Sequence, residues 1–230
     1  MLAATAHVAA CGGGATPEPK TADEQGTRHE HAGGPGISAS AEIGALDEAK
    51  VTATFQAAQG ALQRCVATGA ARNEMEGGDI AFFVKIGEDG RIVHAHAERS
   101  TIGDRETEKC MLDALRSRSW PAPVGGKAGL ARNSFGFDMP NDVRPPTAWE
   151  PGRVEGAVAS LTPRLSECKQ GVKGELTATV YVDPEGAVTS AGVAASDESG
   201  EGAADCVTSV LKGARFPSPG SWPAKVTFPL

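Results

Sequence analysis

Apolar and polar positions of the sequence form a helix-like pattern followed by strand-like ones. Between residues 51 and 65 the apolar positions recur at helical spacing. Over residues 80–86 large apolar residues occupy every second position, as in a strand, at Ile80, Phe82, Val84 and Ile86. The turn sequence Gly-Glu-Asp-Gly at residues 87–90 predicts a hairpin into a second strand over residues 91–98. Asp104 is expected to cap a second helix that runs to residue 119, and a last strand is expected over residues 133–138. The predicted order is helix, strand, strand, helix, strand.

The same pattern recurs in the second half of the chain. Cys110 follows Gly90 by 20 positions, and Cys206 follows Gly186 by the same interval. An aromatic residue and a Pro-x-Pro motif come after each of these cysteines, at Trp120 and at Phe216. The second copy is expected to consist of these elements: a helix through residues 154–168, strands at 176–182 and 187–193, a helix at 201–212 and a strand at 224–228. The sequence therefore predicts an α+β fold built from two tandem helix-strand-strand-helix-strand modules.

The repeat sets the expected domain boundaries. The first module is placed at residues 41–138 and the second at residues 153–230. Residues 139–152 between them contain four prolines, which indicates a semi-rigid linker. Residues 12–40 carry almost no large apolar side chains, so they cannot bury enough surface to offset the chain entropy lost on folding, and we expect a disordered tether.

The N-terminal residues point to attachment by lipid. Val8-Ala9-Ala10-Cys11-Gly12 resembles a bacterial lipobox, in which small residues precede the cysteine that is lipidated. Residues 1–11 are therefore interpreted as the remnant of a signal peptide, and Cys11 as the lipidation site. No Lys or Arg precedes Cys11, and the stretch is short for a signal peptide, so we expect that the true start lies upstream or is misassigned. The alternative is a free thiol in a flexible tail.

Charge and hydropathy narrow the classes of partner. The net charge is −7 and no run of Lys or Arg is present, which disfavours binding to nucleic acid or to anionic lipid head groups. No apolar run approaches the roughly 20 residues of a membrane-spanning helix. Contact with a membrane is accordingly expected only through the lipid anchor.

The combination of motifs resembles one known family. A helix–hairpin–helix–strand order, a cysteine in each helix, an Asp-Gly type of hairpin turn, and a cysteine followed by aromatic-Pro-x-Pro are together similar to the AgmX/PglI C-terminal domain. This domain is related to the C-terminal fold of TonB and is abundant in the envelope proteins of myxobacteria. The resemblance covers nearly all of residues 50–138 and 153–230. In the second copy Asp183-Pro184-Glu185-Gly186 replaces the plainer Asp-Gly turn.

The remaining four cysteines divide into two per module. In each module they are expected on the inner faces of two helices that lie side by side on one face of the sheet. We therefore predict the disulfides Cys65–Cys110 and Cys168–Cys206, which implies an oxidising compartment and agrees with export. The alternative is a set of buried free thiols in a cytosolic protein.

Candidate chemistry is sparse. His94 and His96 alternate on one expected strand and so share a face, a spacing able to chelate a metal, and Glu98 continues that face. The second copy has no ligands at these positions, so we interpret the two histidines as part of an exposed polar strand face. No recognised hydrolase, metalloprotease, phosphate-binding or dinucleotide-binding motif is present. We expect neither enzymatic activity nor a cofactor.

The leading functional hypothesis follows from the resemblance. TonB-like domains engage partner peptides at an exposed sheet edge, which implies that residues 133–138 and 224–228 bind envelope proteins or peptides by strand addition. The residues expected to make these contacts are Ser134, Phe135, Phe137, Val226 and Phe228. The expected location is the periplasmic side of the outer membrane, where the protein would serve motility, transport or envelope assembly. Two alternatives stay open: a periplasmic metal-dependent or hydrolytic enzyme that uses His94 and His96, and a structural spacer whose modules pack on each other through the Trp149 linker.

Overall fold

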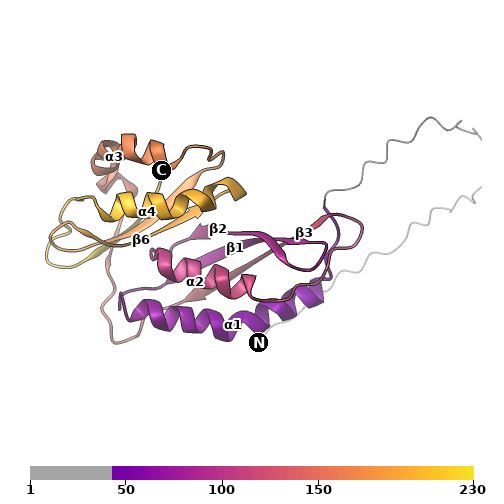
Figure 1. Ribbon diagram of the computed structural model, residues 1–230. Helices are drawn as coiled ribbons and strands as arrows, with labels where there is room; N and C mark the ends of the chain where they lie inside the picture. Colours follow the sequence, from indigo (N-terminus) through magenta and orange to yellow (C-terminus); the bar gives the residue numbers. More distant parts are fainter. Residues whose placement is uncertain (1–42) are drawn as a thin grey trace, which may run out of the picture. The chain divides into compact units, whose positions relative to one another are not determined.

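The computed structural model describes residues 43–230, which form one compact unit (Figure 1). The predicted lipidation site Cys11 and the predicted tether, residues 12–40, lie outside the described residues. The N-terminal half consists of two helices and three strands, α1 Glu48–Ala70, β1 Gly78–Gly87, β2 Ile92–Ser100, α2 Arg105–Arg116 and β3 Ala128–Phe137. Its element order is the predicted one.

The C-terminal half repeats this order with additions. A short strand and a 3-10 turn precede it, and a second 3-10 turn leads into its last helix. Its elements are β4 Thr147–Trp149, η1 Pro151–Arg153, α3 Glu155–Cys168, β5 Leu176–Val182, β6 Val188–Ala195, η2 Glu198–Ala203, α4 Ala204–Lys212 and β7 Ala224–Pro229. The sequence pattern did not predict β4, because it lies in the proline-rich segment that we interpreted as a linker.

Two sheets carry the helices on one face each. The first is antiparallel with the order β2-β1-β3, and the second has the order β4-β7-β5-β6 with only the β4–β7 pair parallel. In Figure 1, α1 and α2 lie on the lower side of the first sheet, and α3 and α4 lie on the upper side of the second. The α+β fold class predicted from the sequence is confirmed.

The two glycines that aligned the repeat have the same structural role in both halves. Gly90 and Gly186 end the hairpin turns with φ angles of +73° and +81°, in the left-handed region that glycine tolerates best. Their carbonyl groups accept hydrogen bonds from the backbone N–H of Trp120 (3.0 Å) and of Phe216 (2.8 Å). A Cβ atom at either glycine would collide with the carbonyl oxygen of that same aromatic residue. The hairpin turn thus lies directly against the segment after the second helix. This contact explains why the hairpin glycine and the aromatic-Pro-x-Pro motif recur together in both halves.

Both predicted disulfides are present. Cys65 and Cys110 join α1 to α2 with a Cα–Cα distance of 5.7 Å, and Cys168 and Cys206 join α3 to α4 with a distance of 5.5 Å. The expectation that all four cysteines lie on inner helix faces was wrong for Cys110 and Cys206, which are exposed. The buried side of α2 is instead formed by residues such as Met111, Leu112 and Leu115, and that of α4 by Val207 and Leu211.

The two halves meet through polar, buried contacts. The guanidinium group of Arg105 at the start of α2 is buried and donates to the carboxylates of Glu201 and Asp205, at 2.8 Å in each case. The hydroxyl group of Thr179 in β5 donates to the carbonyl oxygen of Ser100, at 3.2 Å. These contacts join β2 and α2 to β5, η2 and α4, so the halves are not separated by a free linker.

Candidate functional site

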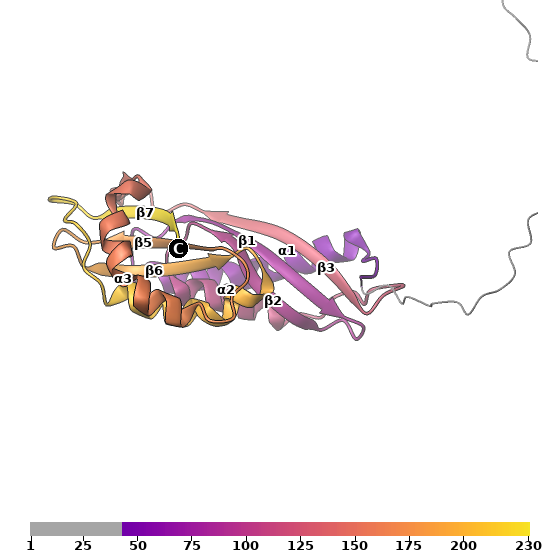
Figure 2. The same ribbon diagram turned by 90° about the horizontal axis from the view of Figure 1, so that it is seen from above.

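The outer edge of β3 lacks a strand partner over most of its length within residues 43–230. β3 pairs with β1 over its whole length, from Gly87 opposite Ala128 to Gly78 opposite Phe137. On its other side the described residues supply only an isolated bridge, in which Ile43 lies parallel to Ala128 and the Gly44 N–H donates to the Ala128 carbonyl (2.7 Å). Figure 2 shows β3 as the outer strand of the first sheet. Its edge is therefore open from residue 130 to residue 137.

The first half of the β7 edge, residues 224–226, is already paired within the chain, contrary to the prediction that this edge is free. β4 lies parallel to β7, with Thr147 opposite Ala224 and Trp149 opposite Val226, and the Thr147 N–H donates to the Pro223 carbonyl at 2.9 Å. Val226 and Phe228 are also buried in the core of the C-terminal half, with exposed fractions of 1% and 3%. Their side chains belong to the core and do not form a binding surface, and the backbone of Val226 lies in the part of β7 that is paired with β4, so the prediction is corrected on these two points.

At the opposite edge of the second sheet, one N–H group of the outer strand β6 is bound by the N-terminal half. The N–H of Val193 in the outer strand β6 donates to a carboxylate oxygen of Glu108 at 3.1 Å, and the Ser100 hydroxyl donates to the other oxygen at 2.6 Å. Glu108 is completely buried, and this burial raises its pKa to about 7 against the opposing effect of the two hydrogen bonds. Helix α2 thus supplies a polar group that satisfies an edge donor of the other half.

Alternation along the ladder shows which backbone groups of β3 face outward. The Thr101 N–H donates to the Asp79 carbonyl, so Asp79 faces the β2 side and the next residue, Ile80, faces β3. Ile80 lies opposite Phe135, whose backbone groups therefore point to β1. The neighbouring even-numbered residues present their N–H and C=O groups to the outside, and these are Leu130, Arg132, Ser134 and Gly136.

One of these outward donors has an intramolecular partner. The Ser134 N–H donates to the side-chain oxygen of its neighbour Asn133 at 2.8 Å. Ser134 and Asn133 are both exposed, so this contact exchanges readily with water. A partner strand could therefore displace this one exposed bond and pair with the Ser134 N–H.

A groove runs beside this edge, between β3 and α1. It has a volume of about 230 Å³, and its apolar lining includes Phe55 and Leu62 from α1 together with Phe135 from β3. Gln56 and Gln59 of α1 form part of its polar lining. Phe135 is half-buried, as is Phe137, whereas Ser134 is exposed. The three predicted contact residues of the first half thus lie on an open edge next to a partly apolar groove.

The histidine pair is not the exposed face that the sequence pattern indicated. His96 is buried with an exposed fraction of 1%, and its ring stacks on Phe83 with the ring centroids 4.9 Å apart. Burial, and secondarily the neighbouring His94, lower the pKa of His96 to about 4. The Nε2 atom of His94 lies 3.2 Å from Nδ1 of His96.

Glu98, the candidate third metal ligand beside the two histidines, is paired with an arginine instead. The Glu98 carboxylate accepts hydrogen bonds from Arg132 at 3.1 and 3.2 Å. No group of three or more His, Cys, Asp or Glu side chains arranged to hold a metal occurs within residues 43–230. Within the described residues the two imidazoles therefore lie in contact with each other without a third ligand arranged beside them.

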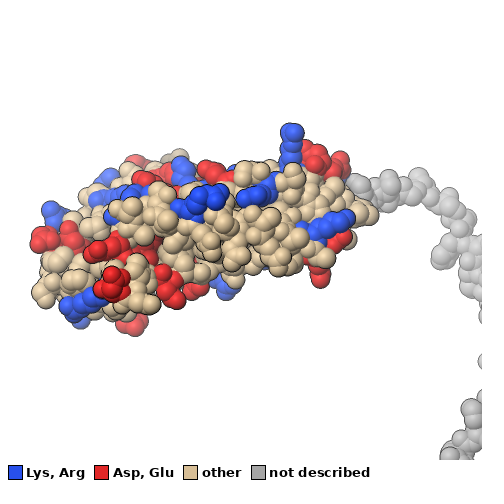
Figure 3. Space-filling model, turned by 90° about the horizontal axis from the view of Figure 1, so that it is seen from below, with Lys and Arg blue, Asp and Glu red and all other residues tan. Residues whose placement is uncertain are grey.

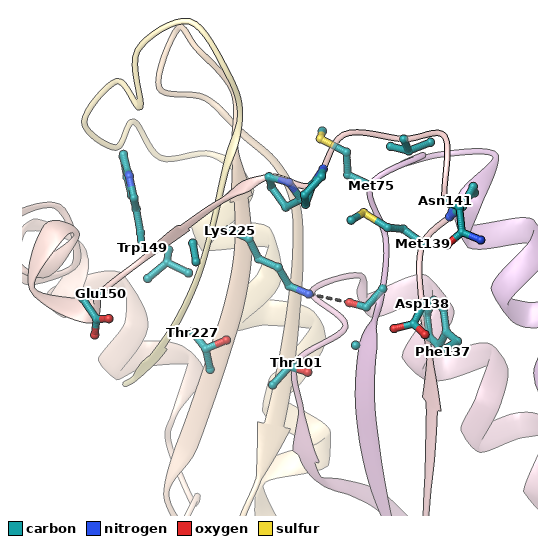
Figure 4. A pocket seen from close by; sticks show the side chains of 18 of the residues that line it. Met75, Thr101, Phe137, Asp138, Met139, Asn141, Trp149, Glu150, Lys225 and Thr227 are labelled. Carbon is teal, nitrogen blue, oxygen red and sulfur yellow. Dashed lines mark hydrogen bonds between the residues drawn. The ribbon is translucent and has the colours of Figure 1, made fainter.

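A larger cleft, not predicted from the sequence, lies where β3 ends. Its volume is about 860 Å³, and it lies between the segment after β3, the β4 segment and β7. Lys225 of β7 extends into it, and its ammonium group donates to the Gly77 carbonyl at 2.6 Å (Figure 4). A lone lysine in an alternating strand is typical of a solvent-facing position, so no signal in the sequence could have identified it.

Charged side chains of both signs are interspersed over the face seen from below (Figure 3). Blue and red groups alternate there, and uncharged surface lies between them. This face therefore has no continuous basic footprint of the kind that binds nucleic acid.

Comparison with known protein families, with curated proteins and with solved structures finds no match for the chain. The family resemblance seen in the sequence motifs stays a prediction. The two disulfides indicate an oxidising compartment outside the cytoplasm. Within the described residues, each helix is too short or too polar to cross a bilayer.

Proposed function

We propose that this protein is a non-enzymatic, exported lipoprotein that binds an extended segment of an envelope protein along the edge of β3. The observation that carries the proposal is the open edge from residue 130 to residue 137, with outward backbone groups beside the groove of α1. A partner strand would satisfy those groups by main-chain hydrogen bonds, and its alternate side chains would enter the groove.

The chain itself provides a precedent for this mode. In both halves a segment that precedes the first helix lies parallel to the last strand, Ile43 beside Ala128 and β4 beside β7. In the C-terminal half the added strand covers three of the six residues of β7. In the N-terminal half it covers only the first residue of the ten in β3, so most of that edge is left for another chain.

The cellular setting completes the proposal. Cys11 would carry the lipid and hold the folded part at the periplasmic side of the outer membrane, in agreement with the oxidising compartment indicated by the disulfides. Membership of the AgmX/PglI C-terminal family would fit a role in motility, transport or envelope assembly. Labelling with palmitate tests the anchor: the wild-type protein should incorporate the label and a Cys11→Ala variant should not.

Affinity capture from an envelope extract tests the edge. Ser134→Pro removes an outward N–H without removing a bond of the β1–β3 ladder, because the Ser134 N–H faces away from β1. Ser134→Ala is the matched control, since it keeps the N–H. A partner that is retained by the wild type and by Ser134→Ala but lost with Ser134→Pro supports strand addition. Capture that is unaffected by the proline contradicts it, and the absence of any partner favours a structural spacer.

A further inference from the structure

Lys225 is a cation without a carboxylate partner in a cleft with a partly apolar lining. Within residues 43–230 no Asp or Glu lies within 4.0 Å of its ammonium nitrogen. Its contacts are the Gly77 carbonyl, at 2.6 Å, and the ring of Tyr181, whose centroid is 5.1 Å from the nitrogen. An ammonium group has three N–H donors, so a single carbonyl leaves most of its hydrogen-bonding capacity unused.

The partly buried position of the Lys225 ammonium group makes N–H donors without partners unfavourable in free energy. Burial lowers the pKa of Lys225 to about 8, although the carboxylates of Glu76 and Asp79 act in the opposite direction. A charge removed from water is stabilised most by an opposite charge that also accepts hydrogen bonds. The floor of the cleft is therefore complementary to an anionic group.

The walls of the cleft are complementary to an apolar body. Met75 and Met139 lie on one side of the cleft and Trp149 on the other (Figure 4). Methionine side chains are flexible and polarisable, which suits them to contact with an alkyl or aromatic group. A volume of about 860 Å³ is within the range of small-molecule sites.

We propose that this cleft binds a small amphipathic carboxylate, whose carboxylate group pairs with the Lys225 ammonium and whose apolar chain lies between the methionines and Trp149. Two acidic residues, Asp138 and Glu150, also line the cleft, but both are exposed. Their charge is screened by water, whereas that of Lys225 is held next to the site. This site shares no lining residue with the β3 groove, although Phe137 at the end of β3 belongs to its lining, and its ligand is a small molecule rather than a strand.

The methionine methyl groups provide a local test with octanoate as the probe. With ¹³C-methyl-methionine labelling of the full chain, octanoate should shift the signals of Met75 and Met139 saturably. Met111 is fully buried in the core of the N-terminal half, so its signal should not move and serves as the internal control. Octan-1-ol has the same chain without the charge, and it should bind at least about tenfold more weakly because it cannot form the ion pair.

Two substitutions of Lys225 distinguish the contribution of its charge to octanoate binding from that of the apolar walls of the cleft. Lys225→Leu should abolish the preference for octanoate over octan-1-ol, and Lys225→Arg should retain it, with an unchanged Met111 signal in both showing that the fold is intact. Octanoate binding should also weaken as the pH rises through about 8, where the amine loses its proton. Equal affinity of the wild type for octanoate and octan-1-ol, or no saturable shift of Met75 and Met139, overturns the proposal.

Discussion

At the scale of single residues, the hairpin glycines connect the sequence repeat to the fold. Gly90 and Gly186 combine a positive φ angle with a carbonyl oxygen from Trp120 or Phe216 at the place where a side chain would start. Gly125 also has a positive φ, of +78°, but nothing lies within 4 Å of the position of its missing Cβ. The three glycines therefore allow the backbone cost to be separated from the steric cost.

We expect Gly90→Ala and Gly186→Ala to destabilise the protein more than Gly125→Ala does. The left-handed conformation alone costs a non-glycine residue about 1 kcal/mol, and displacing a backbone carbonyl adds at least about 1 kcal/mol more. Chemical denaturation of the three variants measures this difference in the free energy of unfolding. Equal losses in all three would show that the contact with the aromatic segment has no steric cost.

Glu108 links stability to pH. Burial raises its pKa to about 7 in the folded protein, above the ordinary value of 4.5 that applies to the unfolded chain. Between these values the unfolded state has released its proton while the folded state keeps it. The contribution of this group to the free energy of unfolding is therefore complete below pH 4.5 and is lost as the pH rises to about 7.

Replacing Glu108 with Gln should remove this dependence. The stability of the wild type relative to Glu108→Gln is expected to fall between pH 4.5 and pH 8 by at most about 3 kcal/mol. Denaturation at a series of pH values checks the difference, and Glu167→Gln makes the same chemical change on an exposed helix surface. The interpretation fails if Glu108→Gln and the wild type show parallel pH profiles.

At the scale of elements, β4 shows how a sheet edge is closed from within the chain. Only three residues pair with β7, and the Thr147 N–H supplies one bond to the Pro223 carbonyl. In a parallel ladder the next N–H along the strand points away, so the N–H of Ala148 faces outward. Replacing Thr147 with proline therefore removes the hydrogen bond to the Pro223 carbonyl, just before β7, whereas replacing Ala148 removes no bond to this strand.

Thr147→Pro should loosen β4, and Ala148→Pro should not. Loss of the Thr147 donor is expected to cost about 1 kcal/mol and to increase hydrogen exchange at the β7 amides that face β4. Ala148→Pro should leave exchange in β7 unchanged, because the ring replaces an N–H that has no role in the ladder. If both variants expose β7 equally, the pairing does not depend on this bond.

Elements with a clear period were predictable from the sequence, and those defined by tertiary contact were not. The strand pattern at residues 176–182 coincides with β5, and Asp104 caps α2 as expected, by accepting from the N–H groups of Glu106 and Thr107. β3 begins at Ala128 rather than at residue 133, because its first residues alternate too weakly to stand out.

For the candidate site, too, the sequence predicted a local element but not the tertiary contacts around it. An edge at residues 133–138 followed from the repeat and the family resemblance. Three features depend on contacts between residues distant in sequence. These are the pairing of β4 with β7, the partial burial of Lys225 and the burial of His96. No local pattern records such contacts.

At the scale of the whole folded unit, the two halves are coupled by ion pairs of a buried guanidinium group, that of Arg105. The side chain of Arg105 has an exposed fraction of 9%, that of Glu201 16%, and that of Asp205 57%. Lys109 adds a second, more exposed contact with Asp205 at 2.9 Å. If Arg105 loses Glu201 and Asp205, or Glu201 loses Arg105, the remaining group becomes an unpaired charge in a poorly solvated position.

Arg105→Ala should therefore weaken the coupling between the halves as well as the overall stability. We expect a loss of roughly 3 kcal/mol, and a broadened or two-step unfolding curve in place of a single transition, because the C-terminal half would then open separately. Arg91→Ala, at an exposed pair with Asp89, is the control and should change stability by less than about 0.5 kcal/mol. A double-mutant cycle with Glu201→Ala measures the coupling energy directly. Additive effects of Arg105→Ala and Glu201→Ala, with unfolding still in one step, would show that the halves are held together by their apolar and backbone contacts rather than by this ion pair.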